Sequence, residues 1–429
     1  MIKDILHKLK YLKGKLKNKE IRQLSENFAS LFTLQGLNYI LPLITFPYLV
    51  RVLGPDKYGL IAFASAFIGY FGIIVDYGFK LSAPREVAIN RNNKEKLSEI
   101  FSSIMVIKIV FMILSFIVLC VVVFSFEKFK HDWIVYIFTF IGILGNVLFP
   151  VWFFQGMERM KYITFLNIIS KTIFTISIFV FIKNTSDYIY VPLINSLGYL
   201  VAGVLSLIFI FKEFNVVFKI PTKTEIIHQL KEGWHIFVST VSINTYTKSN
   251  MVILGLFTNN TIVGYFAAGY RLIQAFLGML NPISQTFYPY ISRLTSESKE
   301  KAISVIKKLI KGVGVFTFIL SLLIFIFADL IVKIVLGEQY YNSTIVIRIL
   351  AFLPFIIGLS NIFGIQTMLT FGHKRAFTKI IIAGGITNII LAVILVPFWK
   401  HIGISISILI TEIVITLSMY IYLKWKKII

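Results

Sequence analysis

Basic side chains occur inside stretches of sequence that are otherwise apolar. An ionised amine or guanidinium at the centre of a lipid bilayer costs roughly 2.5–3.5 kcal/mol on insertion scales, so it requires a polar cavity or a charged partner. Carboxylates within such stretches are much scarcer than these cations, so the cations cannot all be neutralised in pairs. The imbalance predicts an electropositive cavity and an anionic cargo. The basic residues concerned are Lys108, Lys171, Lys248, Arg271 and Arg348.

Polar side chains recur on the same helical faces as three of these cations. Residues three, four or seven apart lie on one side of an α-helix. Such a face requires water or another helix beside it, because hydrocarbon cannot satisfy hydrogen bonds. The stripes therefore predict cavity-lining helices. The three stripes that contain a cation are Thr240, Asn244 and Lys248; Arg271, Gln274, Asn281 and Gln285; and Asn167, Lys171 and Thr175. A further polar stripe, without a cation, consists of Gln35, Asn38 and Thr45.

The remaining two cations and two carboxylates have alternative interpretations. Lys108 and Arg348 lie close enough to the ends of their apolar stretches to extend toward the interface, so a structural role is as consistent as substrate binding. Glu412, within the last stretch, and Asp76, near the end of the second, are candidates for coupling transport to a proton or sodium gradient. Glu412 serves equally well as the counter-ion of a lysine. No cofactor is expected, and no Cys/His cluster has the spacing of metal ligands.

The composition of the chain requires a membrane environment. Apolar residues make up 57% of the 429 residues and charged residues only 15%, with a mean hydropathy of +0.82. A soluble chain of this length could not bury so much apolar surface, so lipid must cover much of it. The net charge of +23 does not indicate a nucleic-acid partner, because Lys and Arg gather between the apolar stretches as topology determinants.

About twelve apolar stretches are long enough, at about 20 residues each, to cross a bilayer as helices. An even number puts both termini on one side of the membrane. Lys and Arg favour the loops on that side by about four to one, so the positive-inside rule predicts that both termini are cytoplasmic. The expected spans are 27–50, 59–77, 98–124, 132–154, 162–182, 188–211, 233–257, 262–290, 305–327, 343–371, 377–398 and 401–423.

Weak internal similarity divides the spans into two halves of six helices. Gly59 begins an Ala-rich run, and Gly264 begins a similar one. Pro84 follows Gly59 at the same sequence distance at which Pro289 follows Gly264. Two lobes related in this way enclose a central cavity that can open to either side of the membrane. The expected domains are a basic amphipathic segment at 1–26, lobes at 27–211 and 232–429, and a cytoplasmic linker at 212–231.

The sequence lacks the marks of several enzyme classes. It contains no Walker motif or other Gly-rich phosphate loop leading into a helix, so the chain is not expected to be an ATPase by itself. The predicted outer loops are short and carry no Asp-x-Asp pair, which argues against a membrane glycosyltransferase. A transporter is therefore favoured over an enzyme.

Short motifs carry a resemblance to a known family. LP at 41–42 and FPYLVRVLG at 46–54 precede YG at 58–59, and DYGF, SAPRE and WFFQG stand at 76–79, 82–86 and 152–156. Together they resemble the Wzx-type O-antigen and polysaccharide flippases of the multidrug/oligosaccharidyl-lipid/polysaccharide exporter superfamily. The resemblance extends over essentially the whole chain.

The resemblance implies an all-α membrane protein with two six-helix lobes in a V shape that alternate between inward- and outward-facing states. Its cargo would be an undecaprenyl-diphosphate-linked oligosaccharide, flipped from the cytoplasmic to the periplasmic face of the bacterial inner (plasma) membrane. The product would feed synthesis of O-antigen, capsule or another surface polysaccharide, with polymerase and chain-length regulator proteins acting downstream. One alternative is an ion-coupled exporter of drugs or of other lipid-linked precursors; more cavity acids than Glu412 and Asp76 would have favoured the drug exporter. The other is a non-transporting scaffold of a polysaccharide assembly complex, which would not need basic helices with polar stripes.

Overall fold

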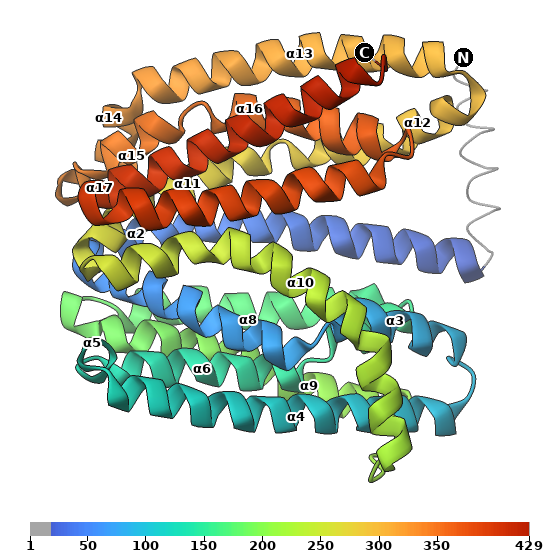
Figure 1. Ribbon diagram of the computed structural model, residues 1–429. Coiled ribbons are helices and arrows are strands. Elements are labelled where there is room, and N and C mark those ends of the chain that lie inside the picture. The colour runs from blue at the N-terminus through green and yellow to red at the C-terminus, as the bar shows by residue number, and fades with distance from the viewer. Residues whose placement is uncertain (1–18, 429) are drawn as a thin grey trace, which may run out of the picture. The chain divides into compact units, whose positions relative to one another are not determined.

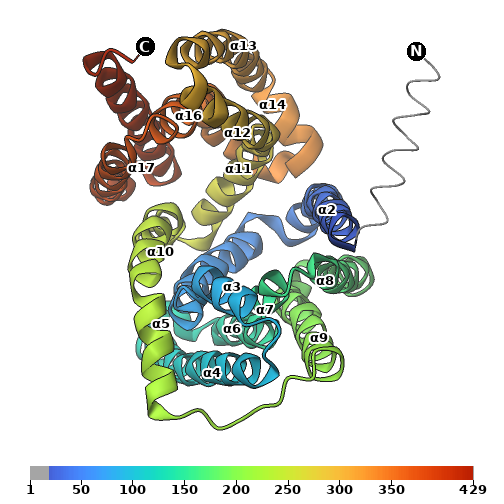
Figure 2. The same cartoon turned by 90° about the vertical axis from the view of Figure 1, so that its right-hand side faces the viewer.

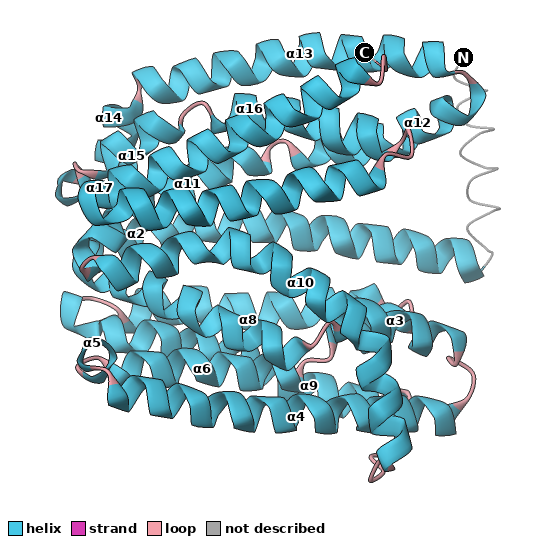
Figure 3. Ribbon diagram, in the orientation of Figure 1, coloured by secondary structure: helices cyan, strands magenta, loops and turns pink. Residues whose placement is uncertain are grey.

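The computed structural model describes residues 19–428, without the side chains of 19–40, 42–43 and 242–247. The described residues form helices and short loops and contain no strand (Figure 3). This confirms the expected all-α membrane class. The amphipathic segment expected at 1–26 lies largely outside the described residues.

The long helices run nearly parallel or antiparallel to the helices packed beside them, as a membrane requires (Figure 1). The elements are α2 (Lys19–Asp76), α3 (Phe79–Ile89), α4 (Lys94–Ser125), α5 (Glu127–Lys130), α6 (Trp133–Leu148), α7 (Val151–Gly156), α8 (Met160–Phe181), η1 (Thr185–Ile189), α9 (Tyr190–Glu213), α10 (Lys223–Phe257), α11 (Asn260–Gly278), α12 (Asn281–Glu297), α13 (Lys299–Ile326), α14 (Ala328–Ile331), η2 (Val332–Leu336), η3 (Glu338–Tyr340), α15 (Ser343–Leu350), α16 (Leu353–Asn361), η4 (Ile362–Leu369) and α17 (Lys374–Trp425).

Nine helical segments of the described chain are long and apolar enough to cross a bilayer. The last of them, α17, has 52 residues, or roughly 78 Å of helix, which is more than twice the hydrocarbon thickness of about 30 Å. Its helix is interrupted at Lys400 (φ 49°, ψ −124°), so the spans expected at 377–398 and 401–423 lie on either side of the break. The total of twelve spans stays a prediction.

The long helix α2 is interrupted at Gly54, whose φ of +69° favours glycine. The next residue, Pro55, has no N–H, so the Arg51 carbonyl lacks its usual helical donor. The side-chain amide of Gln339 replaces that donor, at 2.8 Å from the Arg51 oxygen and 3.3 Å from the Val50 oxygen. The break separates the spans expected at 27–50 and 59–77, and the backbone carbonyls of Val50 and Arg51 beside it both accept a hydrogen bond from Gln339.

The chain divides into two compact units. Unit 1 contains the described part of Met1–Phe46 together with Ile68–Lys183 and Ile189–Val241. Unit 2 contains Pro47–Phe67, Asn184–Tyr188 and Ser242–Ile429. The helices α2 and α10 each contribute to both units. The lobe and linker boundaries expected from the sequence stay a prediction.

In unit 1, α6 and α8 both pack against α9, as seen along the helices in Figure 2. Serine hydroxyls on α9 donate to carbonyls of α6: Ser196 to Phe138 at 2.7 Å and Ser206 to Leu148 at 3.0 Å. Small residues of this kind let helices approach closely in lipid. The aromatic residues of the WFFQG segment, 152–156, are buried in the same unit against Phe101, so this motif is part of the packing.

In unit 2, α2 and α11 approach backbone to backbone at Gly59 and Gly264. A Cβ on Gly264 would lie 1.9 Å from the Pro55 carbonyl oxygen, and one on Gly59 would lie 1.9 Å from the Asn260 oxygen. Neither backbone can move away without separating the helices. The two glycines that marked the internal similarity in the sequence therefore also meet in space.

We expect Gly264→Ala to destabilise the protein by roughly 1–3 kcal/mol or to prevent its accumulation, because the new methyl group overlaps backbone atoms. Thermal unfolding in detergent and membrane abundance measure the effect. Gly312→Ala in α13 is the matched control, since a Cβ there meets nothing within 4 Å. Equal stability of the two variants would contradict this packing.

Candidate functional site

Arg271 lies on an exposed polar face of α11 and α12 in unit 2. Gln274, Asn281 and Gln285, which the sequence placed on the same stripe, are exposed as well. The opposite face of α11 is buried and includes Leu272 and Ile273. The guanidinium is therefore not enclosed by protein atoms and can be reached by a ligand.

One tyrosine of unit 2 lies near this cation, and a second tyrosine lies near the first. The hydroxyl of Tyr58, on α2, lies within electrostatic range of the Arg271 guanidinium. Tyr340, in the loop before α15, is fully buried close to Tyr58 and Tyr265. Burial raises the pKa of Tyr340, and these neighbours raise it further, so its phenol stays neutral. Of Tyr58, Tyr340 and Arg271, Arg271 is therefore the charged residue.

Glu412 reaches the same helix from α17. The hydroxyl of Tyr270 is hydrogen-bonded with the Gln274 side chain and lies within electrostatic range of Glu412. Because Tyr270 and Arg271 are adjacent in sequence, the candidate ion-coupling group on α17 lies near the same short segment of α11 that carries the candidate anion-binding group. We call Tyr58, Tyr270, Arg271, Gln274 and Glu412 the α11 cluster.

A buried polar network fixes α17 beside this cluster. The Asn388 side chain has no exposed surface, and its amide donates to Ser407 at 3.1 Å and to Thr411 at 3.4 Å. Ser407 in turn donates to the Asn388 carbonyl at 3.1 Å. These bonds tie the two halves of α17 together. They hold the turn that carries Glu412, the neighbour of Thr411, in a defined orientation.

The structure leaves parts of the other predicted stripes undescribed. Lys248 is half-buried on α10 in unit 2, while the side chain of Asn244 lies outside the described residues, as does that of Asn38 on α2. Lys171 is half-buried on α8 in unit 1. Lys248 and Lys171 both take part in interactions within the protein, and their role in binding stays a prediction.

The two cations with alternative interpretations each have a carboxylate partner. Lys108 donates to Asp76 at 3.1 Å in unit 1, with only 5% of the lysine side chain exposed against 34% of the aspartate. Arg348 pairs with Asp329 in unit 2, where both side chains are about half exposed. These contacts favour structural roles for Lys108 and Arg348, and they give Asp76 a resident counter-ion.

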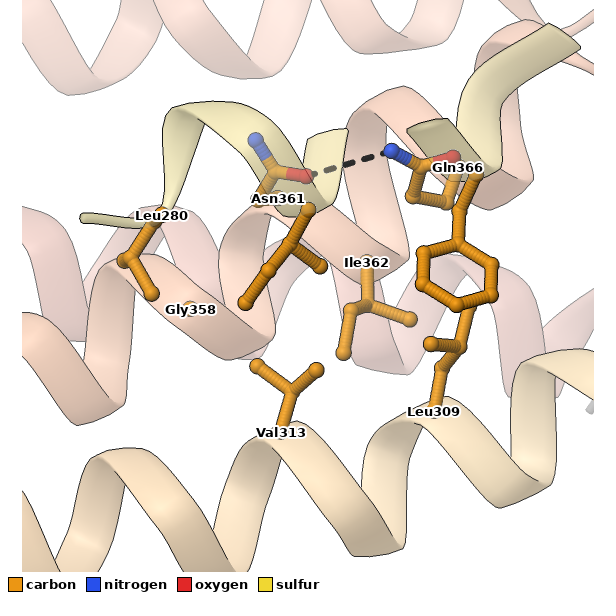
Figure 4. A pocket seen from close by; sticks show the side chains of 9 residues that line it. Leu280, Leu309, Val313, Gly358, Asn361, Ile362 and Gln366 are labelled. Atoms are coloured by element: carbon orange, nitrogen blue, oxygen red, sulfur yellow. Dashed lines mark hydrogen bonds between the residues drawn. The ribbon is translucent and has the colours of Figure 1, made fainter. Parts of the chain in front are cut away.

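Unit 2 also contains a small cavity lined by the N-terminal part of α12 and by α13, α16 and the π-helix η4 (Figure 4). The amides of Asn361 and Gln366 meet along one side of it, with Gln366 donating to Asn361 at 3.5 Å, and Leu309 and Val313 lie opposite. Its volume of about 10 Å³ has room for one water at most, so it is no cargo site. Within the described chain, no group of three or more His, Cys, Asp or Glu side chains could hold a metal ion.

The sequence did not mark Tyr58 or Tyr270 as site residues, although Tyr58 belongs to the YG motif at 58–59 that carries the family resemblance. The chain contains 20 tyrosines, and an aromatic ring beside an apolar stretch usually faces lipid. The available signal for Tyr270 was its position next to Arg271 and four residues before Gln274. No local pattern could have brought Tyr58 or Glu412 to α11, because those contacts depend on packing between distant segments.

A family model and curated proteins match this chain over much of its length. The family model described as "Polysaccharide biosynthesis protein" matches residues 24–295. A protein of Escherichia coli (strain K12) named "Putative O-antigen transporter" is 35% identical over 95% of this chain and 98% of its own length. A protein of the same name from Shigella dysenteriae is 28% identical over 92% and 99%. A Haloferax volcanii protein named "Probable low-salt glycan biosynthesis flippase Agl15" is 22% identical over 84% and 75%.

Solved structures show the same fold at low sequence identity. An inward-facing multidrug resistance MATE family transporter of the MOP superfamily superimposes with a TM-score of 0.73 and 13% identity, over 90% of this chain and 94% of that one. The lipid II flippase MurJ, in an inward closed conformation, gives a TM-score of 0.70 and 14% identity, over 94% and 87%.

We expect Asp76→Asn to lower the free energy of unfolding by about 3 kcal/mol, because it leaves the ammonium of Lys108 buried beside a neutral amide. The double variant Lys108→Met/Asp76→Leu removes both charges and should recover most of the loss. Thermal unfolding of the purified variants measures both effects. A double variant that is less stable than Asp76→Asn would show that the unpaired charge of Lys108 is not the cause of the lost stability.

Proposed function

Since this chain belongs to the polysaccharide biosynthesis protein family of Wzx-type flippases, we propose that it flips an undecaprenyl-diphosphate-linked oligosaccharide from the cytoplasmic to the outer face of the membrane. It is a membrane transport protein and not an enzyme, as its named relatives are transporters and flippases. The coarser activity, flipping of a polysaccharide precursor, follows from that relationship. The diphosphate carrier is the proposal.

The exposed guanidinium of Arg271 is the observation that carries this proposal. A diphosphate is a dense anion whose oxygens match the paired N–H groups of an arginine. Moving it through hydrocarbon without a partner is prohibitive, and a cation partway across lowers that cost. Gln274, exposed one turn along α11, offers an additional hydrogen-bonding group on the same face.

Lys248 and Lys171 extend this mechanism in the proposal. Each is half-buried, one in each compact unit, within an apolar helix. A half-buried ammonium can exchange a resident contact for a phosphate oxygen more readily than the nearly buried Lys108 can. We assign Lys248 to the phosphate path together with Arg271, and Lys171 to the corresponding path in unit 1.

Glu412 supplies a candidate driving force. An ionised carboxylate within a membrane binds a proton, a sodium ion or a basic side chain. Because Tyr270 lies within electrostatic range of Glu412 and is adjacent to Arg271 in sequence, binding of a cation at Glu412 would alter the electrostatics where the diphosphate binds. We therefore propose that a proton or sodium gradient acts through Glu412. Asp76 is the weaker candidate because it is paired with Lys108.

The remaining elements of the proposal follow from charge and from the relatives. We propose that both termini lie in the cytoplasm, because the loops predicted on that side carry most of the Lys and Arg. We also propose that the protein resides in the inner membrane, as the family resemblance implies. Polysaccharide polymerase and chain-length regulator proteins would act on the product. Export of cationic drugs is less consistent with the α11 cluster, whose exposed charge is a guanidinium, and the likeness to drug exporters at 13% identity concerns the fold alone.

We expect Arg271→Ala and Lys248→Ala to lose most surface polysaccharide when they replace the wild-type protein in a flippase-null strain. Lys248→Arg should keep partial activity because it keeps the charge, whereas Arg271→Lys should lose more because it loses the bidentate contact. Arg293→Ala is the matched control, as Arg293 is exposed on α12 and paired with Glu297. All variants are compared at equal protein abundance. Wild-type polysaccharide in both alanine variants would refute the cationic path at these positions.

We expect Glu412→Gln to abolish the dependence of headgroup translocation on an imposed proton or sodium gradient in liposomes, while cargo still binds. The glutamine amide has nearly the same shape as the glutamate carboxylate, but it cannot bind and release a proton or a sodium ion. Glu297→Gln, which removes an exposed carboxylate from α12, should respond to the gradient as the wild type does. If Glu412→Gln also keeps its response, the carboxylate is a structural counter-ion.

A further inference from the structure

The two faces of α13 have different environments in unit 2. One face is buried in a cluster with α12 and η4, through Ala302, Ile306, Leu309 and Val313. Thr317, Ser321 and Ile324 continue this buried stripe along the helix. The opposite face is exposed over its whole length, so it meets the surroundings of the protein and not its core.

The first half of the exposed face forms a basic hollow of about 570 Å³. Lys307, Lys308 and Lys311 line it, together with Glu300 and Ser304, at the three- and four-residue spacing of one helical face. The only carboxylate among its lining residues, that of Glu300, accepts a hydrogen bond at 2.8 Å from Ser298, the N-cap of the helix. The hollow is therefore positively charged.

The second half of the exposed face is apolar. Val315, Phe318, Ile319 and Leu322 follow Lys311 at helical spacing and are 36–55% exposed. Gly312 lies between the two halves. A Cβ there would meet nothing within 4 Å, so the protein surface is open at the boundary between the basic and the apolar half of this face. From Lys311 to Leu322 the helix rises roughly 16 Å, close to the depth of about 15 Å of one leaflet's hydrocarbon.

A basic hollow continuous with an apolar stripe of one-leaflet length matches an anionic membrane phospholipid in its dimensions and is complementary to it in charge. We propose that this face of α13 is a binding site for an anionic phospholipid, with its phosphate at Lys307, Lys308 and Lys311. One acyl chain would lie along Val315–Leu322, with Gly312 leaving room at the junction. This site is separate from the α11 cluster and independent of the proposed cargo.

Charge complementarity favours an anionic lipid over a zwitterionic one. Each lysine near a membrane surface raises the affinity for anionic headgroups by roughly several-fold. Salt weakens this attraction because it screens the charges. Lysines that act only as topology determinants would be solvated and would retain no particular lipid. The two cases differ in whether a lipid remains bound after extraction.

The test uses the full-length protein in nanodiscs containing equal amounts of phosphatidylglycerol and phosphatidylcholine. The lipids that stay bound after detergent extraction are counted by native mass spectrometry. We expect the wild type to retain phosphatidylglycerol preferentially and Lys308→Gln/Lys311→Gln to reduce that preference roughly ten-fold or more. Lys299→Gln/Lys301→Gln is the matched control: it removes two exposed lysines from the same end of the helix but outside the hollow.

Three further outcomes decide between occupants. Free glycerol phosphate should not displace the bound lipid, because it has no acyl chain; displacement would mean that the site binds small anions, which overturns the proposal. Preferential displacement by undecaprenyl phosphate would identify the cargo lipid as the occupant and overturn it as well. An equal loss in both double variants, at matched thermal stability, would show that only overall charge matters and would likewise overturn the proposal.

Discussion

Hydrocarbon offers no hydrogen bonds, so each polar group within a membrane-spanning helix must find its partner inside the protein or in a path that water or a ligand can enter. The helix break at Gly54, just beyond the span expected at 27–50, shows how this protein satisfies a backbone carbonyl from within at the end of a span. Pro55 removes a backbone donor from the carbonyl of Arg51, and Gln339, nearly three hundred residues later, supplies the missing bond. The contact joins α2 to the loop before α15, so local backbone chemistry determines part of the packing of unit 2.

The same requirement separates structural charges from functional ones. Lys108 is almost fully buried and paired with Asp76, and Arg348 is paired with Asp329, so these cations have resident partners within the protein. Arg271 is different because it remains exposed on a polar face that the rest of unit 2 does not cover. We propose that this exposed cation binds an anion that passes it. Glu412, near Tyr270, brings a group that can exchange a cation to the same segment of α11.

The sequence contained enough information to predict the class of fold and most of the charged residues of the site. Apolar stretches of the right length predict spans regardless of how they pack, and a lysine or arginine within such a stretch stands out for its energetic cost. Contacts between distant segments could not be predicted in this way. Tyr58 reaches Arg271 because Gly59 and Gly264 allow α2 and α11 to touch, and that depends on the absence of two Cβ atoms. The pairing of Lys108 with Asp76 likewise required the helices to be placed side by side before either residue could be interpreted.

We propose that the anionic diphosphate, and not the sugar, is what the protein recognises while its cargo crosses the membrane. The most direct measurement compares two cargoes in liposomes that contain the purified protein: one oligosaccharide attached to a polyprenyl diphosphate, and the same oligosaccharide attached to an uncharged polyprenyl lipid. The appearance of sugar on the opposite face is followed with a membrane-impermeant lectin. The account predicts rapid translocation of the diphosphate-linked cargo and little or none of the uncharged one. Equal rates for the two cargoes would contradict it.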